Sequence, residues 1–162
     1  MGMTPKMALE IREFRPGDET AFRELNEEWI NRYFVMEPKD VASIADPRNS
    51  ILDRGGRILL AVQDGGRPVG CCALMVIAPG EFEVAKMAVT QSCQGAGIGR
   101  RLLEETIALA RRLDARRLYL ETNSKLGPAI HLYESLGFHH VPPERVVPSP
   151  YARANVHMEL VL

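Results

Sequence analysis

The chain has 162 residues, 46% of them hydrophobic and 25% charged, with a formal net charge of −1. This length suits one domain with a single core, and the balanced charge excludes the clustered Lys and Arg of a nucleic-acid-binding surface. Residues 1–19 lack a basic segment followed by an apolar run, so neither a signal peptide nor a membrane span is predicted. The cysteines Cys71, Cys72 and Cys93 fit reduced thiols in a cytoplasmic protein.

The N-terminal part of the chain predicts a strand followed by two helices. Residues 9–14 alternate apolar and polar side chains, which is typical of a short strand. Residues 18–34 carry apolar side chains at helical spacing, with Asp18 as the expected N-cap. A second short helix is expected over residues 38–46, where Asp46-Pro47 ends it.

The middle of the chain changes to a strand pattern. Three apolar runs, RILLAVQ, RPVGCCALMVIA and EFEVAKMAV, are joined by short turns that contain glycine, which predicts an antiparallel meander. A glycine-rich loop follows at residues 94–99, and then a helix is expected to run to about residue 113. The next strand, at 116–122, would lie parallel to the third strand of the meander because a helix connects the two.

The last part of the chain predicts one more helix and one more strand. Pro128 is placed at the first turn of the helix AIHLYESL, and Gly137 ends it. Residues 155–162 alternate again and predict a final strand, an edge that can pair between two copies in a homodimer. No repeat or linker interrupts the chain, so residues 1–162 are expected to form one α+β domain.

The loop QGAGIG, at residues 94–99, points to a phosphate-bearing ligand. Glycines between a strand and a helix let several backbone N–H groups converge on an anion at the positive end of the helix. A dinucleotide fits poorly, because Arg100 stands where the third glycine of the dinucleotide-binding fingerprint is needed, although Glu121 lies near the usual position of the ribose-binding acid. A P-loop is excluded by the absence of Gly-Lys-Ser/Thr. The loop alone is also compatible with a plain strand-to-helix turn.

Further motifs favour one family. Gln94, Gly97 and Gly99 match the Q/R-x-x-G-x-G/A signature of the GNAT superfamily of N-acetyltransferases, and AIHLYESLGF resembles the second cofactor-side motif of that family. The resemblance covers about residues 58–140 in family order. It implies a single-domain GNAT fold of the α+β class, with a mixed, mostly antiparallel central sheet and helices on both faces. One position departs from the pattern: Leu126 stands where many relatives carry Asn, and the nearest amide is Asn123.

The resemblance implies acetyl-CoA as co-substrate. Its pyrophosphate would lie on the loop and the start of the next helix, with Arg100 adding charge, and its pantetheine arm would lie along the preceding strand, near Asn123. The implied cofactor-binding residues are Met87, Ala88, Val89, Gln94, Gly95, Ala96, Gly97, Ile98, Gly99, Arg100 and Asn123. No metal is expected, because His131, His139 and His140 do not form a convincing ligand set.

Acyl transfer to an amine needs a base, an oxyanion donor and a proton for the departing thiolate. The family resemblance assigns the acid to Tyr133 and the base to Glu83, acting directly or through water in a ternary complex. Glu81 is a rival base, because period two places it on the same face of the strand. The backbone N–H of Val89 is the expected oxyanion donor.

Acceptor specificity is expected from the first helices and from the C-terminal segment. Trp29, Tyr33 and Phe34 are expected to wall a pocket, with Glu37 or Asp40 attracting a cationic amine. Tyr151 and Arg153 are expected at its mouth, where Arg153 suits a carboxylate-bearing acceptor. A small amine or an amino-acid-like molecule is favoured over a protein amine. The rival from another class is a non-catalytic module that binds acyl-CoA.

Overall fold

The computed structural model describes residues 8–162, so the prediction for the N-terminal segment falls in part on residues outside the described range. Helices and strands follow one another along the chain in much the order that the sequence predicts. None of the helices within residues 8–162 is long and apolar enough to cross a membrane. The main elements are β1 (Leu9–Glu13), α1 (Glu19–Tyr33), α2 (Pro38–Ala45), α3 (Pro47–Ser50), β2 (Arg57–Gln63), β3 (Pro68–Ala78), β4 (Glu81–Val89), α4 (Ile98–Arg112), β5 (Arg117–Thr122), α5 (Gly127–Ser135), β6 (His139–His140) and β7 (Val156–Val161).

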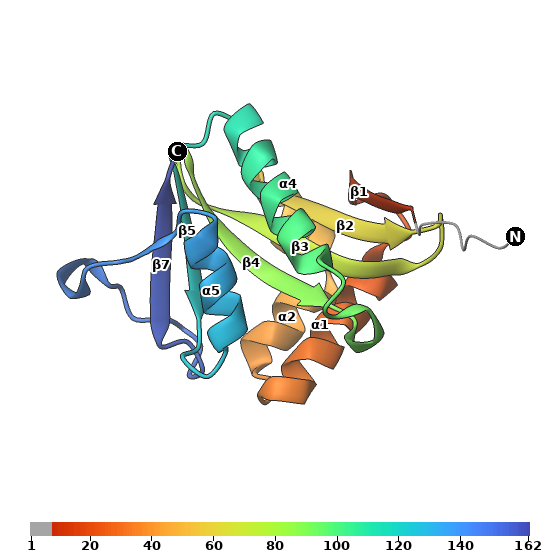
Figure 1. Cartoon of the computed structure of the whole chain (residues 1–162), viewed down its shortest axis with the longest axis horizontal. Coiled ribbons are helices and arrows are strands. Elements are labelled where there is room, and N and C mark those ends of the chain that lie inside the picture. Colours follow the sequence, from red (N-terminus) through yellow and green to blue (C-terminus); the bar gives the residue numbers. More distant parts are fainter. Residues whose placement is uncertain (1–7) are drawn as a thin grey trace, which may run out of the picture.

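The described strands form one sheet in the order β1-β2-β3-β4-β5-β7-β6 (Figure 1). The β4–β5 pair is parallel, because α4 carries the chain back between them, and the other neighbouring pairs are antiparallel. This confirms the predicted meander, the crossover and the α+β class.

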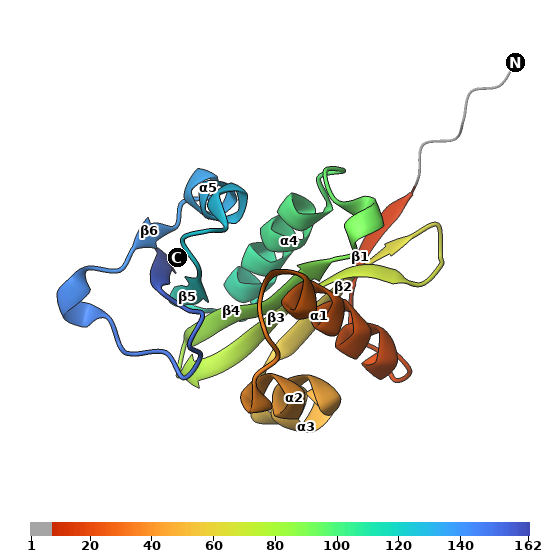
Figure 2. The same ribbon diagram turned by 90° about the horizontal axis from the view of Figure 1, so that it is seen from below.

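Helices cover both faces of the sheet, as expected (Figure 2). Alternation along β2 divides the core: Leu59 packs in a cluster with residues of α4, whereas Ile58 and Leu60 pack in a second cluster with residues of α1 and α2. Side chains that alternate across a strand therefore bury apolar surface on both faces, which is the main driving force for this layered arrangement.

β4 and β5 separate soon after they meet. Their ladder has three residue pairs, from Glu81 opposite Arg117 to Glu83 opposite Tyr119. Beyond that point β4 is bent by an irregularity in its ladder with β3, where Lys86 has a left-handed backbone with φ of 54°. The sequence analysis did not predict this bulge, which turns the last residues of β4 away from β5.

Three details differ from the sequence predictions. Asp18 is the N-cap residue of α1, as predicted, but its carboxylate accepts no capping hydrogen bond from that helix and instead pairs with Arg12 at 2.8 Å. The short helix α3 follows α2 directly and was not predicted. The final strand β7 is not a free edge, because His139 and His140 of β6 pair with its residues Glu159 and Met158.

The turn before β2 requires a residue without a side chain. A Cβ atom on Gly56 would lie 2.5 Å from the carbonyl oxygen of Leu74 and 2.9 Å from that of Ile51. We expect Gly56→Ala to lower the free energy of unfolding by about 1–3 kcal/mol in urea denaturation, because backbone atoms cannot move aside. Gly127→Ala is the control, since a Cβ there meets nothing within 4 Å. Equal stability of the two variants would contradict this packing.

Candidate active site

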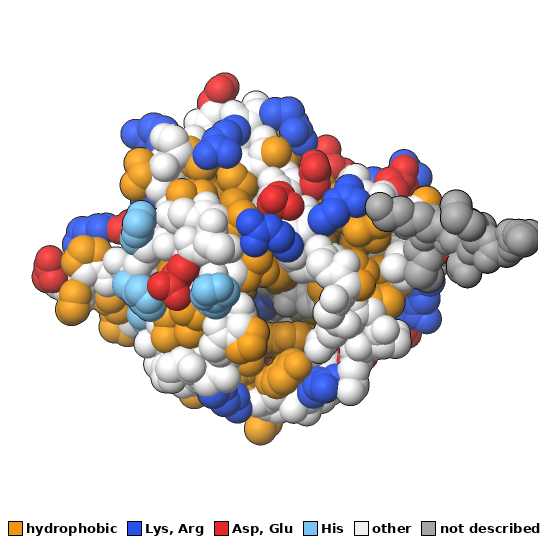
Figure 3. All heavy atoms as spheres, viewed as in Figure 1, with side chains coloured by type: hydrophobic (Ala, Val, Ile, Leu, Met, Phe, Trp, Pro, Cys, Tyr) orange, Lys and Arg blue, Asp and Glu red, His pale blue; other side chains and the backbone are white. Residues whose placement is uncertain are grey.

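A cavity of about 450 Å³ opens where β4 and β5 diverge. The surface is visibly hollowed there, below α4 and between α5 and the first helices, and hydrophobic side chains line the hollow (Figure 3). Residues of α1, β4, the glycine-rich loop, α4, β5, α5 and the segment 151–154 all contribute to its wall. The cavity has two ends, one at the glycine-rich loop and the other at the segment that precedes β7.

The loop end is built to receive an anion. Gly95 and Gly97 have φ of 85° and 78°, a left-handed backbone that other residues adopt only with strain, and a Cβ on either glycine would meet nothing within 4 Å. The helical bond from the Arg101 N–H to the Gly97 carbonyl (3.1 Å) marks the first turn of α4. The N–H groups of residues 98–100 therefore have no partner within the helix, and they lie at its positive end beside the cavity.

The end of β4 presents backbone groups to the cavity. The Thr90 N–H donates to the Val69 carbonyl at 2.8 Å, so Val89 and Gly70 form a non-hydrogen-bonded pair of the antiparallel ladder. The N–H and C=O of Val89 accordingly point away from β3. The carbonyl accepts a hydrogen bond from Gln94 Nε2 at 3.3 Å, which ties the loop to the strand.

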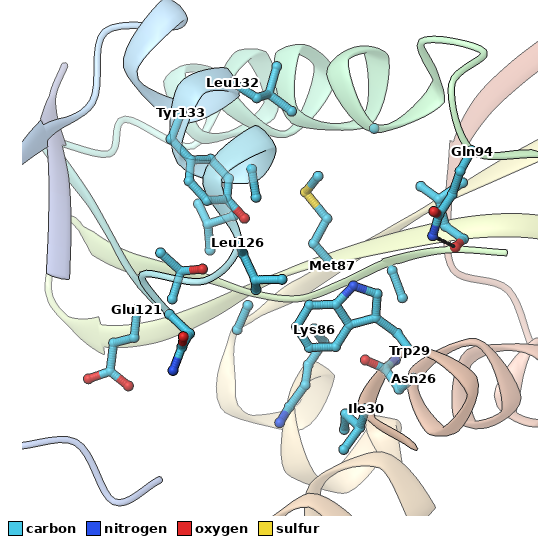
Figure 4. Close-up of a pocket in the computed structure, with 18 of the residues that line it drawn as sticks. Asn26, Trp29, Ile30, Lys86, Met87, Gln94, Glu121, Leu126, Leu132 and Tyr133 are labelled. Carbon is cyan, nitrogen blue, oxygen red and sulfur yellow. Dashed lines mark hydrogen bonds between the residues drawn. The ribbon is translucent and has the colours of Figure 1, made fainter. Parts of the chain in front are cut away.

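Tyr133 projects from α5 into the cavity, with its hydroxyl toward Leu126 (Figure 4). Its ring packs edge-on against Phe138, with centroids 6.0 Å apart. Burial raises the pKa of the Tyr133 hydroxyl above its ordinary value, so the phenol stays protonated at neutral pH. A protonated hydroxyl in an apolar wall can act as a proton donor.

Glu83 also lines the cavity, and its chemistry differs from that of Glu81. Burial, with the nearby charge of Glu121, raises the pKa of Glu83 to about 7, while the ammonium of Lys86 opposes the shift. Glu81 is not among the lining residues and pairs with Arg117 at 3.1 Å. The structure therefore separates the two carboxylates that period two placed together.

A hydrogen-bonded group on β5 and β7, which the sequence analysis did not identify, supports Glu121 at the cavity wall. The Tyr119 hydroxyl donates to Glu121 Oε2 at 2.9 Å, and the Ser149 hydroxyl donates to Oε1 at 2.7 Å. His157 Nδ1 lies 2.7 Å from the same tyrosine oxygen. These hydrogen bonds hold the Glu121 carboxylate in place, and its charge favours a protonated Glu83. The signal was available in the alternation of the strand RRLYLET, where Tyr119 and Glu121 share a face.

The acidic residues expected to attract an amine are already paired. Asp40 is fully buried and accepts from Arg153 Nη1 at 2.8 Å, and Glu37 accepts from the same nitrogen at 3.2 Å. Burial alone would raise the pKa of Asp40, but the hydrogen bonds from Arg153 and from the Glu37 N–H lower it below its ordinary value. This corrects two expectations: neither carboxylate is free for a cationic amine, and Arg153 already binds carboxylates of its own chain.

The remaining predicted residues divide between the cavity and its surroundings. Trp29 and Phe34 line the cavity with ring centroids 5.7 Å apart, and Tyr151 lines it too. Tyr33 does not, because its side chain lies in a separate shallow depression. The other predicted cofactor-side residues lie along the wall, except Ala96; those that line it are Met87, Ala88, Val89, Gln94, Gly95, Gly97, Ile98, Gly99, Arg100 and Asn123.

Asn123 is engaged within the protein. Its Nδ2 donates to the Arg153 carbonyl at 2.6 Å, and its Oδ1 accepts from the Lys125 N–H at 2.9 Å. Its amide therefore holds the loop after β5 against the C-terminal segment, and Leu126 presents an apolar side chain to the cavity (Figure 4). Across residues 8–162, no group of three or more His, Cys, Asp or Glu side chains is arranged to hold a metal ion.

Comparison with known proteins identifies the family. The profile of the acetyltransferase (GNAT) family matches residues 19–138, and the chain belongs to this family. Among curated proteins, a mycothiol acetyltransferase of Thermobifida fusca is 40% identical over 84 residues, which are 51% of this chain and 25% of that protein. The N-alpha-acetyltransferase RimI of Mycobacterium tuberculosis is 36% identical over 85 residues, 51% of this chain and 52% of that protein. The chain thus spans about half or less of the length of these relatives.

Solved structures share the fold over nearly the whole chain. A GNAT-family acetyltransferase of Staphylococcus aureus superposes with a TM-score of 0.83 at 20% identity, covering 94% of this chain and 98% of that one. The yncA protein of Salmonella typhimurium, solved with acetyl-CoA, gives a TM-score of 0.72 at 21% identity and covers 95% and 94%. At these identities the likeness establishes the fold.

The contribution of the buried Arg153–Asp40 ion pair to stability can be tested by mutation. We expect Arg153→Met to lower the free energy of unfolding by about 3 kcal/mol, because it leaves a buried carboxylate without its main partner. Arg57→Met is the control: it removes the exposed pair with Glu13, 2.9 Å apart, and should cost less than about 1 kcal/mol. Equal losses in urea denaturation would show that Asp40 does not depend on Arg153.

Proposed function

We propose that this protein is an acetyl-CoA-dependent N-acetyltransferase that moves an acetyl group to a primary amine by direct transfer in a ternary complex. The observation that carries the proposal is one cavity with the anion-binding loop at one end and the ionisable pair of Glu83 and Tyr133 in its wall. Family membership supports acetyl transfer, and the relatives compared above are themselves named acetyltransferases. A small amine or an amino-acid-like acceptor fits the confined space.

The protein groups at the loop suit coenzyme A. The side-chain-free backbone at Gly95 and Gly97 and the N–H groups at the start of α4 would hold the pyrophosphate, with Arg100 at the rim. The pantetheine arm would lie along residues 87–89, where the Val89 N–H and C=O point away from β3. Bound there, acetyl-CoA supplies an activated acyl group near Tyr133.

The proposed chemistry follows from three groups of this chain. Glu83 takes a proton from the acceptor amine, directly or through water, as the nitrogen attacks the thioester carbon. The Val89 N–H donates to the oxygen that becomes negative during attack. The C–S bond then breaks as the C–N bond is completed, and Tyr133 gives its proton to the departing thiolate. The pKa of Glu83, raised to about 7, suits a base that works near neutral pH, and the raised pKa of Tyr133 keeps its proton in place until the thiolate departs.

The proposal is tested by following the release of free coenzyme A thiol from acetyl-CoA with a panel of primary amines. We expect release that depends on the amine and saturates with it, with the acetylated amine as product. Binding of acetyl-CoA without release for any amine would instead support a non-catalytic acyl-CoA-binding module. Release only with peptides bearing a free N-terminus would favour a protein acceptor, as the name of the relative RimI suggests for that protein.

The role of Glu83 predicts a pH dependence. A base must be unprotonated, so kcat/KM should rise as the pH increases through about 7, the pKa to which burial and Glu121 raise this carboxyl. Glu83→Gln should remove this rise and lower kcat/KM by about 10²-fold or more. Glu81→Gln is the matched control, because Glu81 lies outside the cavity beside Arg117. An unchanged profile in the Glu83 variant would remove the base assignment.

The role of Tyr133 predicts a loss of turnover without a loss of cofactor binding. Tyr133→Phe keeps the ring against Phe138 and removes the proton, so kcat should fall by about 10²-fold while the Kd for acetyl-CoA stays within a factor of about two. Tyr33→Phe, outside the cavity, should leave both unchanged. Stopped-flow kinetics gives kcat and calorimetric titration gives the Kd for acetyl-CoA in each variant. Equal kcat values for Tyr133→Phe and the wild-type protein would exclude the acid role.

A further inference from the structure

Lys86 is a buried cation at the acceptor end of the cavity that neither the proposed chemistry nor the cofactor site uses. Its side chain is 7% exposed and lines the cavity, and it points away from Tyr133 (Figure 4). The left-handed backbone at this position, φ of 54°, interrupts the alternation of β4. The bulge therefore determines where this ammonium lies, which a regular strand would not achieve.

The ammonium has hydrogen-bonding capacity that the described residues do not fill. Its Nζ is 3.3 Å from the Tyr151 hydroxyl and 5.1 Å from the centre of that ring. Asp40 Oδ1 stands at 3.9 Å, beyond hydrogen-bonding distance, because that carboxylate is held by Arg153. An ammonium has three donors, and the hydrogen bond to Tyr151 accounts for one of them.

A second buried polar group is directed into the same end of the cavity. Asn26 of α1 is 2% exposed and lines the cavity beside Trp29. Its Nδ2 donates to the Phe22 carbonyl at 2.9 Å and lies 3.5 Å from Cys71 Sγ, which fixes the amide with Oδ1 as its remaining group. Within residues 8–162 no hydrogen bond to Oδ1 is formed, and Figure 4 shows that oxygen turned toward the Lys86 side. Among the described residues no fully buried side-chain oxygen or nitrogen lacks a partner, so Oδ1 is accessible from the cavity and a ligand there can donate a hydrogen bond to it.

The charges around the cavity are arranged with opposite signs at two places. Arg153 hydrogen-bonds to Asp40 and Glu37, and Lys86, whose ammonium forms an ion pair with Asp40 at 3.9 Å, keeps unused hydrogen-bond donors at the acceptor end. Glu83 and Glu121 supply negative charge further along β4 and β5. A zwitterionic acceptor, with a carboxylate and an ammonium group, is complementary to both places. A simple cationic amine is complementary only to the carboxylates.

We propose that Lys86 and the Tyr151 hydroxyl bind a carboxylate of the acceptor and that Asn26 Oδ1 accepts a hydrogen bond from its amine. The acceptor class is then a free amino acid, with its side chain against Trp29 and Phe34. This inference rests on the proposed transferase function and specifies its substrate. It moves the carboxylate site from Arg153, where the sequence placed it, to Lys86.

The test compares free amino acids with their amides and with their decarboxylated amines, which keep the reacting nitrogen and the side chain but lose the negative charge. We expect at least one amino acid to be preferred about tenfold or more in kcat/KM over its amide, since a charge-assisted hydrogen bond is lost. In Lys86→Met, which keeps the stem and removes the charge, the ratio should fall to about one. Lys125→Met is the matched control, because Lys125 lies outside the cavity over the Phe34 ring.

Two further variants separate recognition from folding. Tyr151→Phe should lower the ratio several-fold, and Lys86→Arg should retain most of it, because the positive charge remains. Melting curves show whether each variant is folded; if Lys86→Met is not, the other two decide. Equal rates with acids and amides in the wild-type protein, or an unchanged ratio in Lys86→Met, would overturn the carboxylate site. If Lys86→Met is not folded, an unchanged ratio in Tyr151→Phe or a ratio of about one in Lys86→Arg would overturn it.

Calorimetric titration of amino acids into the protein saturated with coenzyme A distinguishes this inference from the proposed function. If amino acids bind only when they carry a free carboxylate and Lys86 is present, but no amine causes thiol release, the carboxylate site is supported and the transferase function is overturned. Thiol release without a carboxylate preference would leave the transferase and overturn the carboxylate site. Neither binding nor release with any amino acid would overturn the carboxylate site as well.

Discussion

The early separation of β4 from β5 is the constraint on which the site depends. Three residue pairs join the strands, and the bulge at Lys86 then turns β4 aside. A buried strand edge must still satisfy its backbone groups. On its far edge β5 pairs with β7 along its whole length, whereas at the edge beside the cavity the end of β4 leaves the Val89 N–H pointing away from β3. A ligand with amide groups can form hydrogen bonds with this strand edge. The separation of β4 from β5 therefore creates the cavity and leaves backbone groups in its wall for a ligand to bind.

The same separation sets the electrostatics of the wall. Glu83 sits on the last pair of the ladder, partly removed from water, and opposite Tyr119, whose hydroxyl supports Glu121. Because burial and the charge of Glu121 both disfavour an ionised Glu83, the pKa of Glu83 is raised to about 7. Arg153 meanwhile hydrogen-bonds to both Asp40 and Glu37, and Lys86 forms a further ion pair with Asp40. Many charged side chains at the cavity therefore pair with other side chains of the protein. Those with unused hydrogen-bonding capacity are available for chemistry or recognition.

The sequence predicted most of the fold because its local patterns agree with one another. Alternation identified the strands, helical spacing identified α1, α4 and α5, and the order of strand, loop and helix identified the parallel crossover. It could not predict the bulge at Lys86, since one residue with a left-handed backbone leaves no mark on hydrophobic alternation. It also misplaced the final strand as an edge, because β6 is only two residues long.

For the site, the sequence identified the residues whose role is carried by a contiguous motif. The loop at 94–99 and Tyr133 belong to such motifs, and both lie at the cavity. Groups assembled from distant segments were missed or misjudged: Arg153 lies more than a hundred residues after Asp40, and their pairing decides what each can bind. The proposed roles of Asn26 and Lys86 follow from the burial and orientation of their side chains, which the sequence does not reveal. The catalytic assignments to Glu83 and Tyr133 stay predictions.

The most direct measurement of the central claim is calorimetric titration of the purified protein with acetyl-CoA in the absence of any acceptor, with NAD as the matched control. The account predicts one binding site for acetyl-CoA and no heat from NAD, because the loop and the end of β4 together fit a single pyrophosphate with a pantetheine arm. A failure to bind acetyl-CoA, or equal binding of NAD, would contradict it and would remove the basis for every assignment made along the cavity.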